Sequence, residues 1–247
     1  MRPDLLTSDD VAFYRDNGYF LYRKPVFSGE QFARLKDIFE EHYQARGTTR
    51  GDELHVPHFR DERLLEFLLA DEVLDLVEPL IGPDIALFSS HFIAKEPFTG
   101  RATPWHEDSA YWNGRFDRFD QIVTIWLAID PTDEENGCMK VVPGTHRHGF
   151  SEYEQVDTTD NTFPEEIRAG SFDASQAVPF VLDPNECSLH DSRIIHGAGP
   201  NRSPRRRTGY TMRYVSQTMR FIPEGNPDHY IWHARGRNVA GNPVANS

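Results

Sequence analysis

The chain has 247 residues, of which 39 are Asp or Glu and 26 are Lys or Arg, so its formal net charge is −13. Non-specific nucleic-acid binding requires a basic surface, and this charge therefore argues against a nucleic-acid partner. Hydrophobic residues make up 38% of the chain, enough for a buried core, but the longest apolar run, residues 122–129, is too short to cross a bilayer. We expect a globular protein with no membrane partner. Because the chain has only two cysteines and no recognisable targeting signal, we also expect a cytoplasmic location.

Helices are predicted in the first third of the chain. Residues 7–16 begin with a hydroxyl cap and end before Asn17-Gly18. Residues 28–46 follow the same logic at greater length, with Ser28 as the cap and apolar residues spaced along one face. Residues 61–81 predict two consecutive short helices divided near Asp71, and Gly82-Pro83 ends them.

After Pro83 the sequence changes to short runs of Ile, Val, Phe, Thr and Tyr separated by turn-forming residues. Strands are predicted over residues 85–95, 103–108, 121–130, 138–142, 177–182, 187–190 and 208–217. This order predicts a mainly β fold with N-terminal helices, in which a barrel or jelly roll is braced by helices on one face. We expect one domain over residues 1–247, with helical support in 1–83, the β core in 84–220 and a C-terminal tail in 221–247.

One connection in the β-rich part is unusually long. Residues 149–173 are acidic and rich in Thr and Asp. A connection of this length is typical of a lid or specificity loop.

The triplet His106-Glu107-Asp108 is the one His-x-Asp/Glu sequence in the chain. A shuffled chain of this composition would contain roughly 1.7 such triplets, so the triplet carries no weight by itself. Its physical merit is that residues i and i+2 of a strand share a face, so an imidazole and a carboxylate can converge on one metal ion.

His196 is the candidate for a third ligand. It follows a strand-like run, precedes Gly197, and lies eleven residues before Arg207, which opens the next predicted strand. Two histidines and one carboxylate leave three open positions on a metal, as in non-haem Fe(II) oxygenases. An arginine one strand away offers the planar fork that a dicarboxylate co-substrate needs at its far end.

Several ordered segments resemble the phytanoyl-CoA dioxygenase family of Fe(II)- and 2-oxoglutarate-dependent oxygenases. They are HFIAKEP, WHEDSAYW, IVTIWLAIDPTDEENGCMKVVPGTHRHG and HGAGPNRSPRRRTGYTMRY, which together span residues 91–214, and the early GYFLYRKPVFSGEQFARLKDIFEEHY resembles the N-terminal strand and helix of the family. The resemblance implies a double-stranded β-helix of the cupin-like, jelly-roll type. It also implies an oxygenase that consumes O2 and 2-oxoglutarate and releases succinate and CO2.

The resemblance further implies a set of site residues. His106, Asp108 and His196 would be the iron ligands, and Arg207 would pair with the C5 carboxylate of 2-oxoglutarate. Trp126 occupies the position of a co-substrate aromatic residue in several members, and Thr124 shares its face by strand parity, so both are expected to bind the co-substrate. Some members have a serine where this chain has Ala198, which removes one expected co-substrate contact. Members that halogenate lack the carboxylate, so Asp108 favours hydroxylation, or another oxidation through the same intermediate, over halogenation. The substrate is expected to be a small molecule.

Five residues are candidates for substrate binding. Tyr111 and Trp112 follow the iron-binding strand and are expected at the substrate mouth, although aromatic core packing is an equal alternative. Arg213 shares strand parity with Arg207, so it points inward as an anion anchor or forms a surface ion pair. Ser89 and His91 share one parity on their strand, which would let them reach the pocket.

Other histidines and the cysteines receive no role. His146 and His148 follow a Pro-Gly turn without an acid at ligand spacing, and His55 and His58 lie in a polar loop that could fold over the site. Cys138 and Cys187 have no CxxC partner. Two alternatives to the oxygenase stay open. One is a cupin-like metalloenzyme that does not use 2-oxoglutarate, and the other is a non-catalytic ligand-binding member of the family.

Overall fold

In the computed structural model, which describes residues 5–245, the helices begin at the predicted caps. α1 (Ser8–Asn17) follows Thr7 and α2 (Gly29–Ala45) follows Ser28, and each cap side chain accepts a hydrogen bond from the amide three residues ahead. The two helices predicted in residues 61–81 are α3 (Leu65–Leu68) and α4 (Asp71–Ile81). Within residues 5–245, no helix combines the length and apolar character needed to cross a bilayer.

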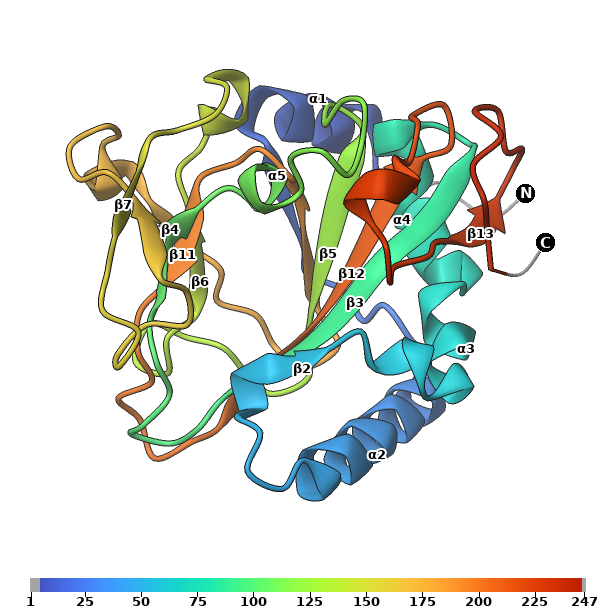
Figure 1. Ribbon diagram of the computed structural model, residues 1–247. Helices are drawn as coiled ribbons and strands as arrows, with labels where there is room; N and C mark the ends of the chain where they lie inside the picture. The colour runs from blue at the N-terminus through green and yellow to red at the C-terminus, as the bar shows by residue number, and fades with distance from the viewer. Residues whose placement is uncertain (1–4, 246–247) are drawn as a thin grey trace.

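The larger of two main sheets has seven antiparallel strands in the order β1, β10, β5, β12, β3, β13, with β2 also paired to β3. The chain's two terminal regions supply β1 and β13 at opposite edges of this sheet (Figure 1). The strand bounds are β1 (Tyr19–Tyr22), β2 (Leu54–His55), β3 (Ile85–Lys95), β5 (Ile122–Ala128), β10 (Cys187–Asp191), β12 (Arg207–Ser216) and β13 (Trp232–Arg235).

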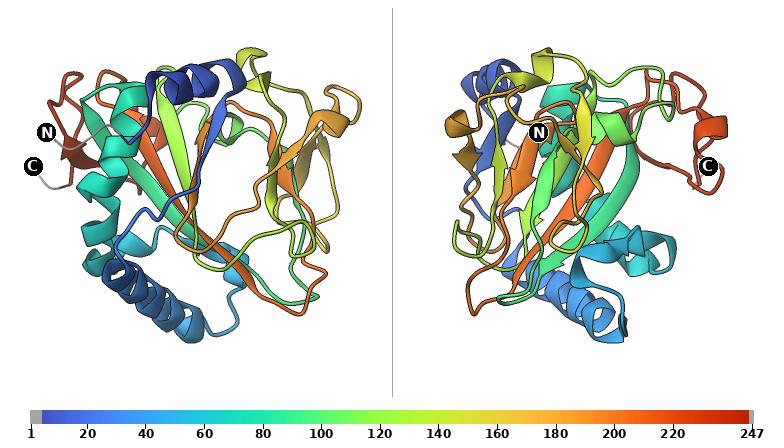
Figure 2. Two further views of the ribbon diagram at one scale, coloured as in Figure 1. Left: turned by 180° about the vertical axis from the view of Figure 1, so that it is seen from behind. Right: turned by 60° about the vertical axis from the view of Figure 1, so that its left-hand side comes forward.

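The smaller sheet faces the larger one across the interior of the molecule (Figures 1 and 2). Its order is β4 (Thr103–His106), β11 (His196–Ala198), β6 (Met139–Val141) and β9 (Val178–Pro179), again antiparallel. α2, α3 and α4 lie on the outer side of the larger sheet (Figure 1). This architecture confirms the predicted mainly β jelly roll with helices on one face.

Six of the seven predicted strands agree with the structure to within about two residues at each end, and the seventh is shorter than predicted. The strand predicted over 177–182 is reduced to the two residues of β9, because Pro179 has no amide hydrogen to continue a ladder. The strand predicted over 103–108 ends at His106, because Glu107 leads into the helical turn α5 (Asp108–Tyr111). The long connection over 149–173 contains a hairpin of β7 (Tyr153–Gln155) and β8 (Glu165–Ile167).

Alternation along the strands gives the larger sheet two different faces. In β12, Tyr210, Met212 and Tyr214 belong to the main hydrophobic core, which also contains the buried side chains of α2, α3 and α4. Residues of the other parity on this strand, among them Arg207 and Arg213, point to the opposite side, toward the smaller sheet. The apolar face therefore holds the helices in place, and the polar face is available for chemistry.

An aromatic cluster beside the sheet buries two histidines. The His58 ring lies 4.6 Å from the Trp232 ring, and the His229 ring lies 4.7 Å from the Phe88 ring. Burial lowers the pKa of His58 to about 3, with a smaller contribution from His229, and burial lowers the pKa of His229 to about 4. Both imidazoles are therefore neutral in the folded protein at pH 7.

We predict that this cluster makes the protein lose stability as the pH falls from about 6.5 towards 4. In that range the unfolded chain binds protons at both histidines and the folded chain does not, so the free energy of unfolding decreases as the pH decreases. His58→Gln should reduce this pH dependence in urea denaturation measured from pH 7 to pH 4.5. The exposed His148→Gln is the control. Equal pH dependence in His58→Gln and the wild type would contradict the prediction.

Candidate active site

A cavity lies between the two sheets. Its walls come from both sheets, from the segment around β2 and from the long connection over residues 149–173. The lining residues are Asp52, Glu53, His55, His91, Ile93, Arg101, Thr103, His106, Asp108, Thr124, Trp126, Met139, Thr162, Phe163, His190, His196, Gly197, Ala198, Arg207, Thr211 and Arg213.

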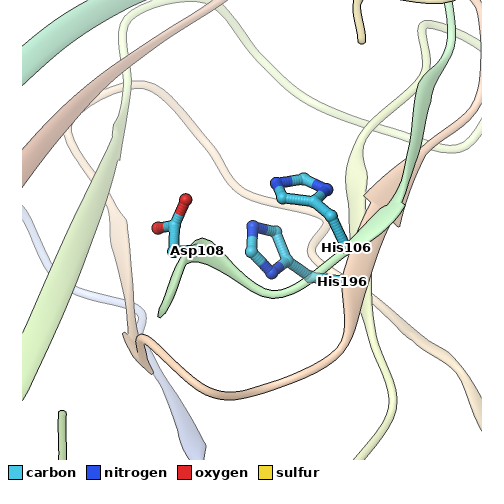
Figure 3. Close-up of side chains that lie close together, drawn as sticks. All are labelled: His106, Asp108 and His196. Atoms are coloured by element: carbon cyan, nitrogen blue, oxygen red, sulfur yellow. The ribbon is translucent and has the colours of Figure 1, made fainter. Parts of the chain in front are cut away.

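His106, Asp108 and His196 converge in this cavity. His106 ends β4, His196 begins β11, and the two residues are direct partners in the strand register. Asp108 is not on the strand as predicted, because it is the first residue of α5, but its carboxylate still turns toward the two imidazoles (Figure 3). One ligand atom of each residue lies within 4.8 Å of the other two, and all three residues are buried.

The two imidazoles are oriented by the backbone. Nδ1 of His106 lies 2.7 Å from the carbonyl oxygen of Pro104, and Nδ1 of His196 lies 3.0 Å from that of Ile194. A carbonyl only accepts, so each Nδ1 donates and each Nε2 keeps its lone pair. Burial lowers the pKa of His106 to about 3, with His196 adding to the effect. A neutral imidazole with a free Nε2 is the form that ligates a metal.

The Asp108 carboxylate is held at one oxygen. Oδ2 accepts a hydrogen bond from the Thr124 hydroxyl at 3.3 Å and from Nε of Arg213 at 3.5 Å. Burial opposes ionisation of Asp108, but Arg213 and the nearby histidines outweigh it and hold the pKa of this carboxyl well below its usual range. An ionised carboxylate and two neutral imidazoles on one side of a centre suit a divalent metal ion that keeps open positions.

Arg207 is buried at the base of the cavity without an acidic partner. Its side chain is 2% exposed, and its Nε and Nη2 donate to the carbonyl oxygen of Gly137 at 3.1 and 2.6 Å. Among residues 5–245, no carboxylate lies within 4 Å of this guanidinium. Burial lowers the pKa of Arg207 to about 10, so it stays charged at pH 7. A buried cation of this kind fits an anion entering from the cavity.

Trp126 and Gly209 shape the space next to this arginine. The guanidinium carbon of Arg207 lies 5.3 Å from the centre of the Trp126 ring. A Cβ on Gly209 would stand 2.0 Å from that ring, so only glycine lets the indole lie flat against β12. Lys95, the register partner of Arg207, donates instead to the carbonyl oxygen of Gly199 at 2.6 Å and secures the segment after His196.

The structure brings together some of the residues predicted to contact substrate. His91 and Arg213 line the cavity, whereas Ser89, Tyr111 and Trp112 are not among its lining residues. Trp112 packs in a hydrophobic cluster with Phe88. Its ring centre lies 5.3 Å from the guanidinium carbon of Arg213, which it therefore supports from behind.

Several lining residues were not identified from the sequence. His55, to which no role was assigned, lines the cavity, with its ring centre 4.0 Å from that of His91. His190 is buried, with its ring centre 5.1 Å from that of His196, and its Nδ1 has no hydrogen-bond partner among residues 5–245. Phe163 approaches His106 to 5.0 Å between ring centres. His190 is the last residue of the strand predicted over 187–190, and its place in the cavity follows from its pairing with Thr124 of β5. Residues 55 and 163 carry no periodic signal in the sequence.

Comparison with known proteins matches residues 14–209 to the family model described as phytanoyl-CoA dioxygenase (PhyH). The chain is 26% identical over 231 residues to a probable alpha-ketoglutarate-dependent hypophosphite dioxygenase of Stutzerimonas stutzeri, covering 82% of this chain and 76% of that protein. It is also 26% identical over 245 residues to the peroxisomal phytanoyl-CoA dioxygenase of Bos taurus, covering 89% and 71%. Among solved structures, the apo non-heme monooxygenase ThoJ is similar with a TM-score of 0.75 and 22% identity, covering 93% of this chain and 84% of that one.

We predict that Arg207→Met raises the free energy of unfolding of the protein free of metal and small molecules, by about 1 kcal/mol or more. The substitution removes a buried charge that no acid compensates. Its neighbour Arg206 is the matched control, because its guanidinium contacts Glu40 and Asp130, and Arg206→Met should lower stability. Urea denaturation measures both variants. Equal destabilisation of the two would show that Arg207 is an ordinary structural residue.

Proposed function

The chain belongs to the phytanoyl-CoA dioxygenase family, and on this premise we propose that it is an Fe(II)- and 2-oxoglutarate-dependent oxygenase that hydroxylates a small molecule. One observation carries the proposal. A His-Asp-His cluster with free ligand atoms and a buried arginine without a carboxylate partner line the same cavity. The first suits a metal ion, and the second suits the far carboxylate of a dicarboxylate co-substrate.

We propose that His106, Asp108 and His196 hold the iron. Their chemistry matches Fe(II), since the two imidazoles present unprotonated Nε2 atoms and the carboxylate is ionised. Thr124 was expected to contact the co-substrate, but its hydroxyl donates a hydrogen bond to Oδ2 of Asp108. Its role is then to orient this carboxylate so that Oδ1 is left for the metal. When bound, iron would activate O2, so that 2-oxoglutarate is converted into succinate and CO2 and a C–H bond of the substrate is oxidised.

Arg207 then binds the C5 carboxylate of 2-oxoglutarate, and Trp126 limits where the chain of the co-substrate lies. The guanidinium is already fixed by two hydrogen bonds to Gly137, so it loses little freedom when it binds. Lys95 is engaged with backbone carbonyls. Ala198 lines the cavity with a methyl group, so a hydroxyl contact made in some relatives is absent here.

The long connection over residues 149–173 keeps water from the site. Its Thr162 and Phe163 line the cavity. Glu107, between the two candidate ligands on the chain, accepts hydrogen bonds from the amide and hydroxyl of Ser151. Arg101 binds Asp52 and the carbonyl oxygen of Asn161, which ties the connection to the segment before β2. These contacts close the cavity over a small substrate.

The experiment that tests this function is an anaerobic titration of the Fe(II)-loaded protein with 2-oxoglutarate, followed by the weak visible charge-transfer band of a chelated 2-oxo acid. We expect a saturating band in the wild type and in Arg205→Met, whose side chain is exposed. In Arg207→Met the apparent dissociation constant for 2-oxoglutarate should rise by about a hundredfold, because a charge-assisted pair is lost. Absence of the band despite bound iron would favour the cupin-like alternative or the non-catalytic one.

We also predict that Asp108→Ala weakens metal binding by at least about a hundredfold without unfolding the protein. The reason is that one of three ligands and the only ionised one is removed. Calorimetric titration with Co(II), which does not need O2 exclusion, measures the affinity, and circular dichroism checks the fold. Thr124→Val is the milder companion, with an expected loss of about three- to tenfold. Unchanged Co(II) affinity in Asp108→Ala would exclude this carboxylate as a ligand.

A further inference from the structure

Three arginines line the cavity, and they differ in how their charge is compensated. Arg101 is paired with two acids, Asp52 at 2.8 Å and Glu53 at 3.0 Å. Arg207 has no acidic partner within the part of the chain that the structure describes, and it is assigned above to the co-substrate. Arg213 is the third, and its only acidic partner within 4 Å among residues 5–245 is Asp108, at 3.5 Å.

The ion pair between Arg213 and Asp108 is weak, and a bound metal ion would compete with Arg213 for the charge of the carboxylate. The contact uses Nε of the guanidinium and Oδ2 of the carboxylate, at the upper limit of a hydrogen bond. Under the function proposed above, Asp108 gives much of its charge to iron. Arg213, whose side chain is 14% exposed, then carries a nearly uncompensated positive charge at the wall of the cavity.

The guanidinium is held in place, but one of its edges is free. Nη1 donates to the Thr211 hydroxyl at 3.0 Å, and that hydroxyl donates in turn to the carbonyl oxygen of His91 at 3.1 Å. Trp112 supports the other side of the group. Nη2 has no hydrogen-bond partner among the described residues. A fixed guanidinium with a free N–H edge is a preformed site for an oxyanion.

Two histidines, His55 and His91, line the same cavity as Arg213. The His55 and His91 rings are 4.0 Å apart. Burial lowers the pKa of both, and Arg213 lowers each further, so both imidazoles are neutral at pH 7. Nε2 of His91 contacts the carbonyl oxygen of Asp52 at 3.2 Å. His55 is more exposed, and its imidazole forms no hydrogen bond with the described residues, so it offers an N–H to an entering anion.

We propose that the substrate is a small molecule with an oxyanion group, which Arg213 binds through its free edge while Thr211 fixes the guanidinium and His55 donates from the mouth of the cavity. This inference rests on the oxygenase function proposed above and specifies its substrate class. Because Arg213 also contacts Asp108, the oxyanion lies next to the metal site. The oxidised carbon is therefore expected within a few bonds of the charged group.

The test uses the anaerobic Fe(II) and 2-oxoglutarate complex at constant ionic strength. Three probes of similar size are titrated: butanoate, propylphosphonate and the neutral butanamide. We expect one oxyanion to shift the charge-transfer band with saturation, at a dissociation constant at least about tenfold below that of butanamide. The oxyanion that binds more tightly assigns the group as a carboxylate or as a phosphorus oxyanion.

Variants assign the binding to Arg213. Arg213→Met should weaken the preferred oxyanion by at least about tenfold, and Arg213→Lys by less, since it keeps the charge and loses the fork. Thr211→Val leaves Asp108 untouched and should weaken the oxyanion by about three- to tenfold. Arg205→Met is the control with no expected change. The apparent dissociation constant for 2-oxoglutarate should stay within about threefold of the wild type in Thr211→Val, which separates substrate binding from damage to the metal site.

Three outcomes would overturn the proposal. One is equal binding of the amide and both oxyanions. Another is unchanged oxyanion affinity in both Arg213→Met and Thr211→Val. The third is displacement of 2-oxoglutarate by the oxyanions, with loss of the band, since they would then occupy Arg207. If no band forms in the wild type, the co-substrate assignment fails, and calorimetry of the oxyanions with the Co(II)-loaded protein and the same variants still tests Arg213.

Discussion

The larger sheet buries both of its faces, and the two faces require opposite chemistry. One face packs against α2, α3 and α4 and consists of alternate apolar residues of β12 and β5, such as Tyr210 and Ile125. Because successive side chains of a strand point to opposite faces, the residues that alternate with them point toward the smaller sheet. These residues include Thr124, Trp126 and Arg207. A shift of one residue in register would exchange the two sets, so the apolar core fixes which residues of this sheet face the cavity.

The parts of the fold that could be predicted from the sequence are those that local residues determine. The helices were predictable because Thr7 and Ser28 are local caps, and the jelly roll because the strands alternate with turn residues. The convergence of His106, Asp108, His196 and Arg207 followed from ordered motifs. The two histidines lie in one cavity because β4 pairs with β11, which brings together residues about ninety positions apart in the sequence. The local sequence around either histidine does not encode this pairing.

The remaining features could not be predicted because they depend on contacts distant in sequence. Asp108 was expected on a strand by parity, but the strand ends two residues earlier, at His106, and a helical turn still directs the carboxylate inward. His55 enters the cavity because β2 pairs with the far end of β3, whereas its polar surroundings in the sequence suggest a loop. Trp112 was expected either at the substrate mouth or in aromatic core packing, and the structure places it in a hydrophobic cluster beside Arg213. Its effect on the site is therefore indirect.

The two edges of the larger sheet have a consequence for how much of the chain the fold needs. β10 and β3 would otherwise present unpaired backbone groups, and they are covered by β1 on one side and by β2 and β13 on the other. These covering strands come from the first and last parts of the chain, outside the segment that holds the candidate ligands. A chain trimmed to that segment would keep every candidate ligand and leave the backbone groups at the outer edges of β10 and β3 unpaired, and unpaired edges are templates for aggregation. The short terminal strands therefore belong to the working fold, although they hold none of the candidate ligands.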